Sequence, residues 1–373
     1  MDASDDRVPV TLLTGFLGAG KTTLLNHLIR HPEAGRIAVI MNELGDVGLD
    51  HDLIEEATEE TILMQSGCLC CSIRGDLGRT MVSLLTRRAC GELDYERIVI
   101  ETTGIADPGP ILQTLIMDQE IAELYRMDGV IALADAANGP HTLDAQFEAV
   151  SQIAVADLIV VTKSDLVLPA ALDRFEARLA DINGTADVVR AEHGHVASGR
   201  LFNLTATRAD VTADTVLGWL ATADPAPDPL AGLSGLTNRG QRPPPPATPP
   251  SNHDSRIVTA SITVDAPIPA DVFDTWLNTL VALRGADLLR VKGVVHVEDV
   301  EFPFVLHGVQ HIFDAPAPLK TWPHDDKTSR VVVIARDFDK AELEAGLETL
   351  RMSPKEADAR ATGMMVHTTE MPF

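Results

Sequence analysis

The fold of this chain is decided by the octapeptide Gly15-Phe16-Leu17-Gly18-Ala19-Gly20-Lys21-Thr22. It matches every fixed position of the phosphate-loop pattern: a glycine, four variable residues, a second glycine, a lysine, and a serine or threonine. An apolar run at 8–13 precedes it and a helical pattern at 21–30 follows it, as a loop between a buried strand and a helix requires. A glycine-rich turn without a ligand is the alternative. Because the pattern, the strand and the helix agree, the sequence favours nucleotide binding.

The residue types within this phosphate loop (15–22) suit a di- or triphosphate. Its glycines allow a tight backbone whose N–H groups point at one anion, and the following helix adds the positive end of its dipole. We expect Lys21 to bridge the outer phosphates as a catalytic group and Thr22 to bind Mg²⁺. The residues expected to contact the nucleotide here are Gly15, Gly18, Ala19, Gly20, Lys21, Thr22 and Thr23.

Composition excludes several classes of function. The chain has 373 residues, 45% of them hydrophobic, and a formal net charge of −25. That charge opposes nonspecific binding to nucleic acids or anionic membranes, and no apolar run is long enough to span a bilayer. The first six residues are acidic and polar, unlike a secretory signal, and three of the four cysteines are crowded into residues 68–71. We therefore predict a cytoplasmic protein without a disulfide framework.

Further apolar runs at 36–41, 97–100, 130–134 and 157–161 alternate with helical patterns. Strands that are apolar on both faces and alternate with helices are typical of a parallel sheet that helices cover on both sides. Polar residues follow each run, and the carboxyl edge of such a sheet is where ligands bind. The sequence predicts an α/β P-loop NTPase domain with a mostly parallel sheet over residues 7–220.

A change of composition divides the rest of the chain. Residues 221–254 are rich in proline, which opposes helices and central strands, so we interpret them as a semi-stiff linker. Residues 255–352 show the order strand, helix, three strands, helix. This order predicts a smaller C-terminal α+β domain with an antiparallel sheet and helices on one face. Residues 353–373 are interpreted as a polar tail.

Several polar or reactive residues outside the motifs are interpreted as structural. Arg290 and Lys292 fall on one face of a predicted strand, where exposure to solvent is the default and a partner contact the alternative. His307 is interpreted as structural. Cys90 stands apart from the other cysteines and is interpreted as a packed thiol.

Glu101 ends the apolar run at 97–100 and begins the sequence Glu-Thr-Thr-Gly. A carboxylate at this position can bind Mg²⁺ or its water ligands opposite Thr22. Gly104 can donate its backbone N–H to the γ-phosphate and act as a hinge that responds to it. Capping of the next helix is the alternative role of Glu101. The phosphate loop favours the Mg²⁺ role, and we assign Glu101 and Gly104 to catalysis.

Thr162-Lys163-Ser164-Asp165 follows the run at 157–161 and resembles the guanine-recognition pattern [NT]-K-x-D. Asp165 can accept hydrogen bonds from N1–H and the 2-amino group of guanine. Adenine lacks both donors and would leave a buried charge unpaired. The stem of Lys163 can cover one face of the base. This guanine motif (162–165) therefore favours GTP over ATP, with Thr162, Lys163 and Asp165 as the contacts.

Gly67-Cys68-Leu69-Cys70-Cys71 presents three thiols within four residues. Neighbouring cysteines form strained disulfides, so this cysteine motif (67–71) favours a soft metal ion, with buried packing thiols as the alternative. A tetrahedral Zn²⁺ site takes four ligands, and Glu43 or Asp46 can supply the missing one if the two loops meet. Zinc is favoured over cobalt (Co²⁺), nickel (Ni²⁺) or iron. The predicted metal ligands are Cys68, Cys70, Cys71, Glu43 and Asp46.

Together these motifs resemble those of the CobW-type metal-trafficking P-loop GTPases, relatives of the GTPases that insert nickel into urease and hydrogenase. The resemblance rests on the phosphate loop, the cysteine motif, Asn42-Glu43-x-Gly45, Glu101-Thr102-x-Gly104, Lys163-x-Asp165 and Leu289-Arg290-x-Lys292-Gly293. Many members begin the guanine motif with asparagine, where this chain has Thr162. Many also carry a histidine-rich run where this chain has prolines, a difference that favours the handling of one ion at a time over metal storage.

The resemblance implies a GTPase that converts GTP to GDP and phosphate, binds Mg²⁺, and delivers a transition metal, with zinc as the favoured ion, to a client metalloprotein. Two alternatives stay open. One is a P-loop phosphotransferase acting on a small metabolite, with a structural zinc. The other is a nucleotide-gated assembly factor for a cobalt or iron enzyme such as nitrile hydratase or cobaltochelatase. A homodimer also stays open, and the base for the attacking water is unassigned among Glu43, Asp46 and Asp107.

Overall fold

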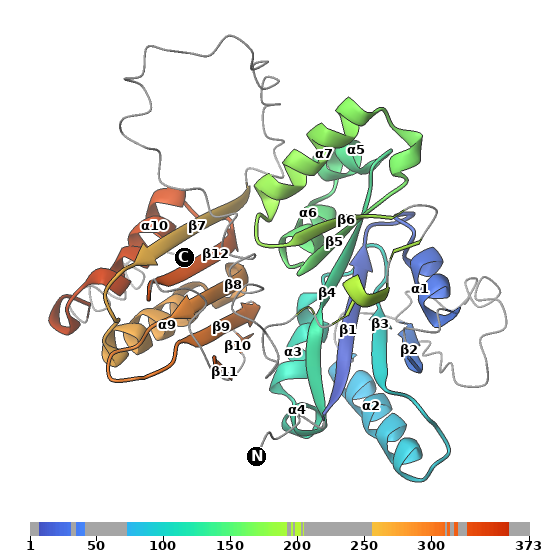
Figure 1. Ribbon diagram of the computed structural model, residues 1–373, viewed down its shortest axis with the longest axis horizontal. Coiled ribbons are helices and arrows are strands. Elements are labelled where there is room, and N and C mark those ends of the chain that lie inside the picture. The colour runs from blue at the N-terminus through green and yellow to red at the C-terminus, as the bar shows by residue number, and fades with distance from the viewer. Residues whose placement is uncertain are drawn as a thin grey trace, which may run out of the picture.

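The computed structural model describes residues 7–30, 35–41, 73–191, 195–196, 198–202, 204, 256–309, 312–313, 317–319 and 327–357. Figure 1 shows two sheets side by side, one from the first half of the chain and one from its last third. The predicted linker at 221–254, the cysteine motif, Glu43 and Asp46 lie outside the described residues, as does the tail beyond residue 357.

The first sheet, predicted to be mostly parallel, is parallel throughout, with the strand order β2-β3-β1-β4-β5-β6. Its strands are β1 (Val8–Gly15), β2 (Ile37–Met41), β3 (Arg97–Glu101), β4 (Tyr125–Asp135), β5 (Leu158–Thr162) and β6 (Asp187–Arg190). The first five match the apolar runs, whereas β6 escapes prediction because its exposed, charged residues break that pattern. Strand β1 lies between β3 and β4, so the phosphate loop emerges in the middle of the carboxyl edge.

Helices cover both faces of this sheet. They are α1 (Lys21–Arg30), α2 (Ile73–Ala89), α3 (Gly109–Met117), α4 (Gln119–Leu124), α5 (Gly139–Ala145), α6 (Phe147–Ala154) and α7 (Pro169–Ile182). Leu13 shares one core with α1, and Leu12 shares the other with α2, α3, α6 and α7, since neighbouring side chains of a strand point to opposite faces. None of the described helices is both long and apolar enough to cross a bilayer. Cys90, directly after α2, is exposed, so the prediction of a packed thiol is wrong.

A pair of tyrosines ties α2 to the start of β4. The hydroxyl oxygens of Tyr95 and Tyr125 lie 3.2 Å apart, and Tyr125 also donates to the carbonyl of Met81 in α2 at 2.8 Å. Both rings are buried. Burial raises the pKa of both phenols, and for Tyr125 the hydrogen bond with Tyr95 raises the pKa further. The two phenols therefore stay protonated within the folded core.

The second sheet is antiparallel, with the strand order β10-β9-β8-β12-β7 and β11 paired to β9. Its strands are β7 (Ile257–Val264), β8 (Leu288–Val295), β9 (Phe304–Val309), β10 (Ile312–Phe313), β11 (Ala317–Pro318) and β12 (Ser329–Arg336). Helices α9 (Ala270–Arg284) and α10 (Lys340–Glu348) pack on one face, where Trp276 and Leu343 join the strand residues in one core. Asp339 caps α10 by accepting from two backbone N–H groups, as predicted. The predicted α+β class is confirmed.

The helix-free face of the second sheet packs against the first domain. Leu289, Val309 and Ile334 on this face belong to the same apolar core as Val150 and Ile153 of α6. The contact between the two sheets is therefore a continuous apolar core and not a loose tether.

This contact also contains a buried ionic cluster of Asp157, Arg290, Lys292 and His307. Asp157 directly precedes β5 at the amino edge of the first sheet, and one of its oxygens accepts from the backbone N–H of Val130 at 2.9 Å. The other contacts Arg290, lies 3.0 Å from Lys292 Nζ and lies 3.6 Å from His307 Nε2. The prediction that Arg290 and Lys292 face solvent is therefore wrong. Their carboxylate partner is far away in sequence, so local patterning cannot reveal it.

Charge and burial oppose each other at this cluster. Burial by itself raises the pKa of Asp157, but Arg290, Lys292 and His307 lower it, and the pKa of this carboxyl ends well below its ordinary value of 3.8. Burial lowers the pKa of Lys292, against the effect of Asp157. The carboxylate form of Asp157 is thus the one that the folded protein stabilises.

Candidate nucleotide site

The phosphate loop connects β1 to α1, and its backbone depends on its glycines. Gly15 and Gly18 have φ angles of 140° and 73°, in the region that favours glycine. A Cβ atom on Gly15 would lie 2.8 Å from the carbonyl oxygen of Leu133 on β4, so no larger residue fits there. Lys21 is buried, and its Nζ donates to the carbonyls of Gly15 at 2.9 Å and Phe16 at 3.4 Å. The positive charge of Lys21 therefore lies against the loop, as binding of an outer phosphate requires.

Thr22 and Glu101, the two residues predicted to bind Mg²⁺, lie side by side. The hydroxyl of Thr22 donates to Glu101 Oε1 at 3.2 Å. Strands β1 and β3 are neighbours, and Leu13 pairs with Glu101, which places this carboxylate directly beside the loop. A hydroxyl and a carboxylate are both hard oxygen ligands, so this pair fits a magnesium ion.

The loop after β3 contacts the phosphate loop at Gly104. A Cβ atom on Gly104 would lie 2.6 Å from the backbone nitrogen of Leu17, so only glycine allows this approach. The backbone of Thr102 continues the contact by donating to the carbonyl of Leu13 at 2.9 Å. Asp107, one of the predicted candidates for a base, accepts from the backbone N–H of Gly109 at the start of α3. That bond assigns Asp107 a structural contact at the beginning of the helix.

The guanine motif is bonded directly to the phosphate loop. Thr162 donates from its hydroxyl to the carbonyl of Ala19 at 2.8 Å, and Lys163 Nζ donates to the carbonyl of Gly18 at 2.8 Å. Lys163 adopts a left-handed conformation with φ of 55°, which is unusual for a residue with a side chain. Asp165 lies in a short 3₁₀ helix (Ser164–Leu166) with its side chain exposed. The residues predicted to contact base and phosphate thus form one connected unit, with Asp165 exposed.

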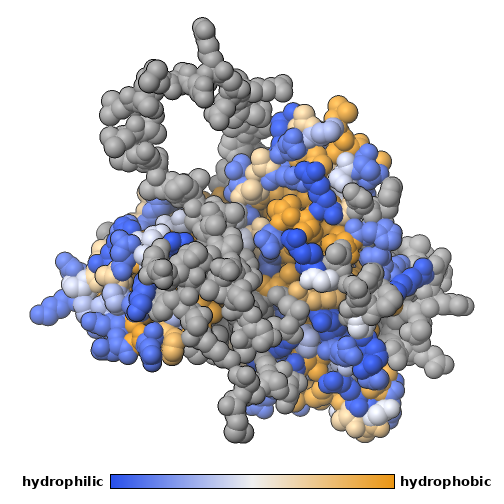
Figure 2. Space-filling view, viewed as in Figure 1, coloured by the Kyte–Doolittle hydropathy of each residue, from blue (hydrophilic) through white to orange (hydrophobic). Residues whose placement is uncertain are grey.

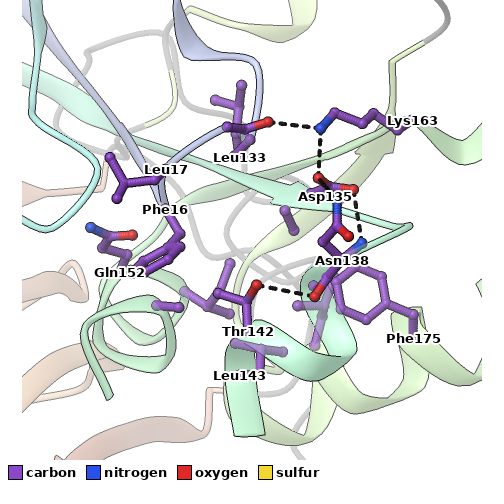
Figure 3. A pocket seen from close by; sticks show the side chains of 17 residues that line it. Phe16, Leu17, Leu133, Asp135, Asn138, Thr142, Leu143, Gln152, Lys163 and Phe175 are labelled. Carbon is purple, nitrogen blue, oxygen red and sulfur yellow. Dashed lines mark hydrogen bonds and ion pairs between the residues drawn. The ribbon is translucent and has the colours of Figure 1, made fainter. Parts of the chain in front are cut away.

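Asp135, at the end of β4, is a member of this site to which the sequence assigns no role. One of its oxygens lies 2.6 Å from Lys163 Nζ (Figure 3), and Asp135 also accepts from the backbone N–H groups of Ala137 and Asn138. Burial raises its pKa, but Lys163 and Asn138 lower it, and the pKa ends below its ordinary value. Strand pairing is the signal that identifies Asp135. In the register of β4 and β5, Asp135 pairs with Thr162, the first residue of the guanine motif.

A cavity of about 190 Å³ lies between the phosphate loop, the end of β4 and helices α5, α6 and α7. Figure 3 shows the side chains that surround it. Most of the lining is apolar, including Phe16, Leu133, Leu143 and Phe175, and the polar lining comes from Asp135, Asn138, Thr142, Gln152 and Lys163.

Apolar side chains are also exposed on the loops of the carboxyl edge. Leu17 follows the start of the phosphate loop, Ile105 follows Gly104, and Leu166 and Leu168 follow the guanine motif; all four are exposed. Figure 2 shows apolar residues (orange) interspersed among hydrophilic ones on the face of the first domain that is in view.

The predicted transition-metal ligands Cys68, Cys70, Cys71, Glu43 and Asp46 lie outside the described residues. Among the residues that the structure does describe, no group of three or more histidine, cysteine, aspartate or glutamate side chains is arranged to bind a metal ion. The transition-metal site thus stays a prediction from the sequence.

Comparison with known proteins identifies two family models and several relatives. The model described as "CobW/HypB/UreG, nucleotide-binding domain" matches residues 9–190, and the "Cobalamin synthesis protein cobW C-terminal domain" matches residues 257–351. The zinc chaperone YjiA of Escherichia coli (strain K12) is 33% identical over 349 residues, 92% of this chain and 99% of that protein. The zinc-regulated GTPase metalloprotein activator 1 of Schizosaccharomyces pombe is 35% identical over 202 residues, 52% of this chain and 48% of that protein. The crystal structure of Zn(II)-bound YjiA GTPase from E. coli matches with a TM-score of 0.68 at 28% identity, covering 93% of this chain and 99% of that chain.

Proposed function

The chain belongs to the CobW/HypB/UreG family and is a GTPase, and on this premise we propose that it binds zinc at its cysteine motif and delivers the ion to a client metalloprotein. The observation that supports its nucleotide chemistry best is the contact between Thr22 and Glu101 beside the phosphate loop. The names of the relatives, zinc chaperone and zinc-regulated GTPase, support zinc as the cargo.

The residues of the site suggest how GTP is handled. Lys21 would neutralise charge on the β- and γ-phosphates, and Thr22 and Glu101 would hold Mg²⁺, which supplies further charge neutralisation when bound. Asp165 would select guanine. Lys163 and Thr162 would keep the base-binding segment in register with the phosphate loop, through bonds to Gly18 and Ala19.

The topology supports communication between nucleotide and zinc. The segment that carries the cysteine motif begins after Met41, at the carboxyl end of β2, and ends where α2 begins at Ile73. Because α2 leads into the parallel strand β3, its first residue belongs to the same edge as the phosphate loop. We infer that zinc and nucleotide share this edge. By linkage, zinc would change GTP affinity by the same factor by which GTP changes zinc affinity.

Further parts of the proposal follow from the same premise. We propose that residues 7–220 form the GTPase domain, 221–254 a linker, 255–352 the C-terminal domain and 353–373 a tail. The exposed Leu17, Ile105, Leu166 and Leu168 support docking of a client, or of a second copy of the chain, at the carboxyl edge. A reducing cytoplasm would keep the cysteine motif free to bind metal.

The proposal is tested by measuring zinc content and GTP hydrolysis on the same protein samples. We expect replacement of Cys68, Cys70 and Cys71 by serine to abolish tight zinc binding and the response of the hydrolysis rate to zinc. Cys90→Ser is the matched control, because this exposed cysteine lies outside the motif. Zinc binding that survives the triple replacement would refute the assigned site.

A second measurement tests the coupling and the metal. GTP affinity is determined in zinc-free and zinc-loaded protein, with Co²⁺ and Ni²⁺ in parallel. Equal GTP affinity in both states would contradict a nucleotide-controlled carrier and leave a structural zinc, as in the phosphotransferase alternative. A larger response to Co²⁺ or Ni²⁺ than to Zn²⁺ would reassign the cargo.

A further inference from the structure

Gln152 on α6 is a buried amide that bonds to the loop after β3. Its side chain lies beside Phe16 and Leu17 in Figure 3, and the residue is 1% exposed. Its Nε2 donates to two backbone carbonyls of that loop, Gly104 at 3.2 Å and Ala106 at 3.0 Å. A single side chain thus fixes two carbonyls that are two residues apart.

These two bonds determine how the loop presents its amide groups. In a trans peptide, the C=O of one residue and the N–H of the next point in opposite directions. Holding the Gly104 and Ala106 carbonyls toward α6 therefore directs the N–H groups of Ile105 and Asp107 away from it. The backbone N–H of Ala106 donates to the carbonyl of Thr103 at 3.1 Å, and this bond closes the turn that contains Gly104 and Ile105. The loop is thereby fixed in one orientation against Leu17 of the phosphate loop.

The hydrogen bonds of the Gln152 side chain are directed at one target, the loop after β3. Among the described residues, Gln152 Oε1 is buried and has no hydrogen-bond partner. A buried polar atom without a partner is destabilising, but an apolar side chain at this position would in turn leave the buried carbonyls of Gly104 and Ala106 without this donor. The apolar side chains of Phe16 and Ile153 line the same cavity as Gln152. The feature that distinguishes glutamine here is its pair of donors to the loop.

We propose that Gln152 is a positioning residue for GTP hydrolysis. It acts through the loop at 104–106, which follows the proposed Mg²⁺ ligand Glu101 and contacts the phosphate loop, and it does not itself touch the nucleotide. The inference rests on the GTPase reaction and on the proposed role of this loop, and it is independent of the metal cargo.

The test is hydrolysis of GTP with Mg²⁺ and no zinc, using the full chain with Gln152→Leu and, as a closer match in shape, Gln152→Met. We expect kcat to fall about 10- to 100-fold, as loss of two hydrogen bonds implies, with KM for GTP within about twofold of the wild type. Thermal stability should also fall, because two buried carbonyls lose their donor. Hydrogen exchange of the amides of Ile105 and Asp107 should become faster, because their peptides are no longer held.

Val150→Ala is the matched control. Val150 lies on the same helix and is fully buried but has no polar contact with the loop, so this variant should lose stability and keep kcat. Unchanged kcat in folded Gln152→Leu and Gln152→Met would overturn the proposal. So would a loss of kcat that Val150→Ala reproduces. A wild-type chain that does not hydrolyse GTP would instead refute the GTPase assignment, and failure of the zinc experiments leaves this inference unaffected.

Discussion

The two edges of the first sheet use the same kind of residue in different ways. At the carboxyl edge, Glu101 and Asp135 end their strands and contact Thr22 of the phosphate loop and Lys163 of the guanine motif, respectively. At the amino edge, Asp157 precedes a strand and contacts Arg290 and Lys292 of the packed strand β8 in the other domain. A carboxylate at a strand end is therefore ambiguous by itself. The element that carries its partner, a loop or a packed strand, separates a ligand site from a structural contact.

The largest effect should come from removing the amino-edge carboxylate. Asp157→Ala leaves Arg290 and Lys292 buried without their partner, which costs about 3–5 kcal/mol of unfolding free energy. Urea unfolding measures this loss. As a matched comparison, Glu176→Ala breaks the exposed ion pair with Arg190 and should change stability far less. Similar losses in the two variants would contradict the structural role of the amino edge.

The Asp157→Ala variant also tests how the contribution of Asp157 to stability changes with pH. The folded pKa of Asp157 is depressed, so its contribution is fully present above its unfolded value of about 4 and is lost as pH falls toward the folded pKa. Arg290, Lys292 and His307 face this carboxylate. The stability difference between wild type and Asp157→Ala should therefore shrink below about pH 4. A difference that grows in acid would show that the depressed pKa is wrong.

Removing the cation of the phosphate loop should abolish most activity and leave the fold intact. Lys21→Ala deletes the charge expected to stabilise the transferred phosphoryl group, and loss of one such donor costs about 10²- to 10³-fold in kcat. Steady-state hydrolysis of GTP measures the effect, and circular dichroism verifies the fold. A kcat within twofold of the wild type would show that Lys21 is not needed for catalysis. It would also weaken the distinction between a ligand-binding carboxyl edge and a structural amino edge.

Nucleotide choice should depend on Asp165. In Asp165→Asn one carbonyl and one N–H replace two acceptors, so GTP affinity should fall by about 1.5–3 kcal/mol, as expected for bonds to a charged group. XTP affinity should rise, because the new amide can donate to the 2-oxo group of xanthine. Asp181→Asn, an exposed change on α7, is the control. Equal preference for GTP in both variants would exclude Asp165 from base recognition.

The smallest expected effect concerns the contact between the two loops. In Gly104→Ala the new Cβ would lie 2.6 Å from the backbone of Leu17, so the loops must separate, at a cost of about 1–3 kcal/mol. We expect this cost to appear in kcat for GTP. Gly346→Ala on α10 is the control, since a Cβ atom there meets nothing within 4 Å. A wild-type kcat in Gly104→Ala would show that GTP hydrolysis does not require the close contact between the two loops.

Local sequence patterns predict much of the first domain. The phosphate loop, α1 and five parallel strands lie where apolar runs and glycines place them. Thr22 and Glu101 come together because β1 and β3 are neighbours, which follows from the parallel architecture with its ligand-binding carboxyl edge. Short-range signals were sufficient for these elements because each carries its own apolar or glycine pattern.

Contacts between distant segments could not be predicted in the same way. Arg290 and Lys292 have the alternation of an exposed strand face, and only the packing of the second sheet on the first buries them. Gln152 has the composition of an ordinary helix residue, and its role depends on where Gly104 and Ala106 lie. Asp135 was visible as a strand end, but its partner Lys163 needed the strand order. Long-range pairing is the information that one sequence lacks.

The paired tyrosines provide an intrinsic optical probe. Tyr95 and Tyr125 are the chain's two tyrosines, and both lie in the nucleotide-binding domain. Because their pKa values are raised above 10.0, the absorbance of tyrosinate near this pH should appear only when that domain opens. Ultraviolet spectroscopy in mild alkali can therefore follow the opening of the GTPase core without a label. The described residues of the second domain contain no tyrosine, so they add no tyrosinate absorbance.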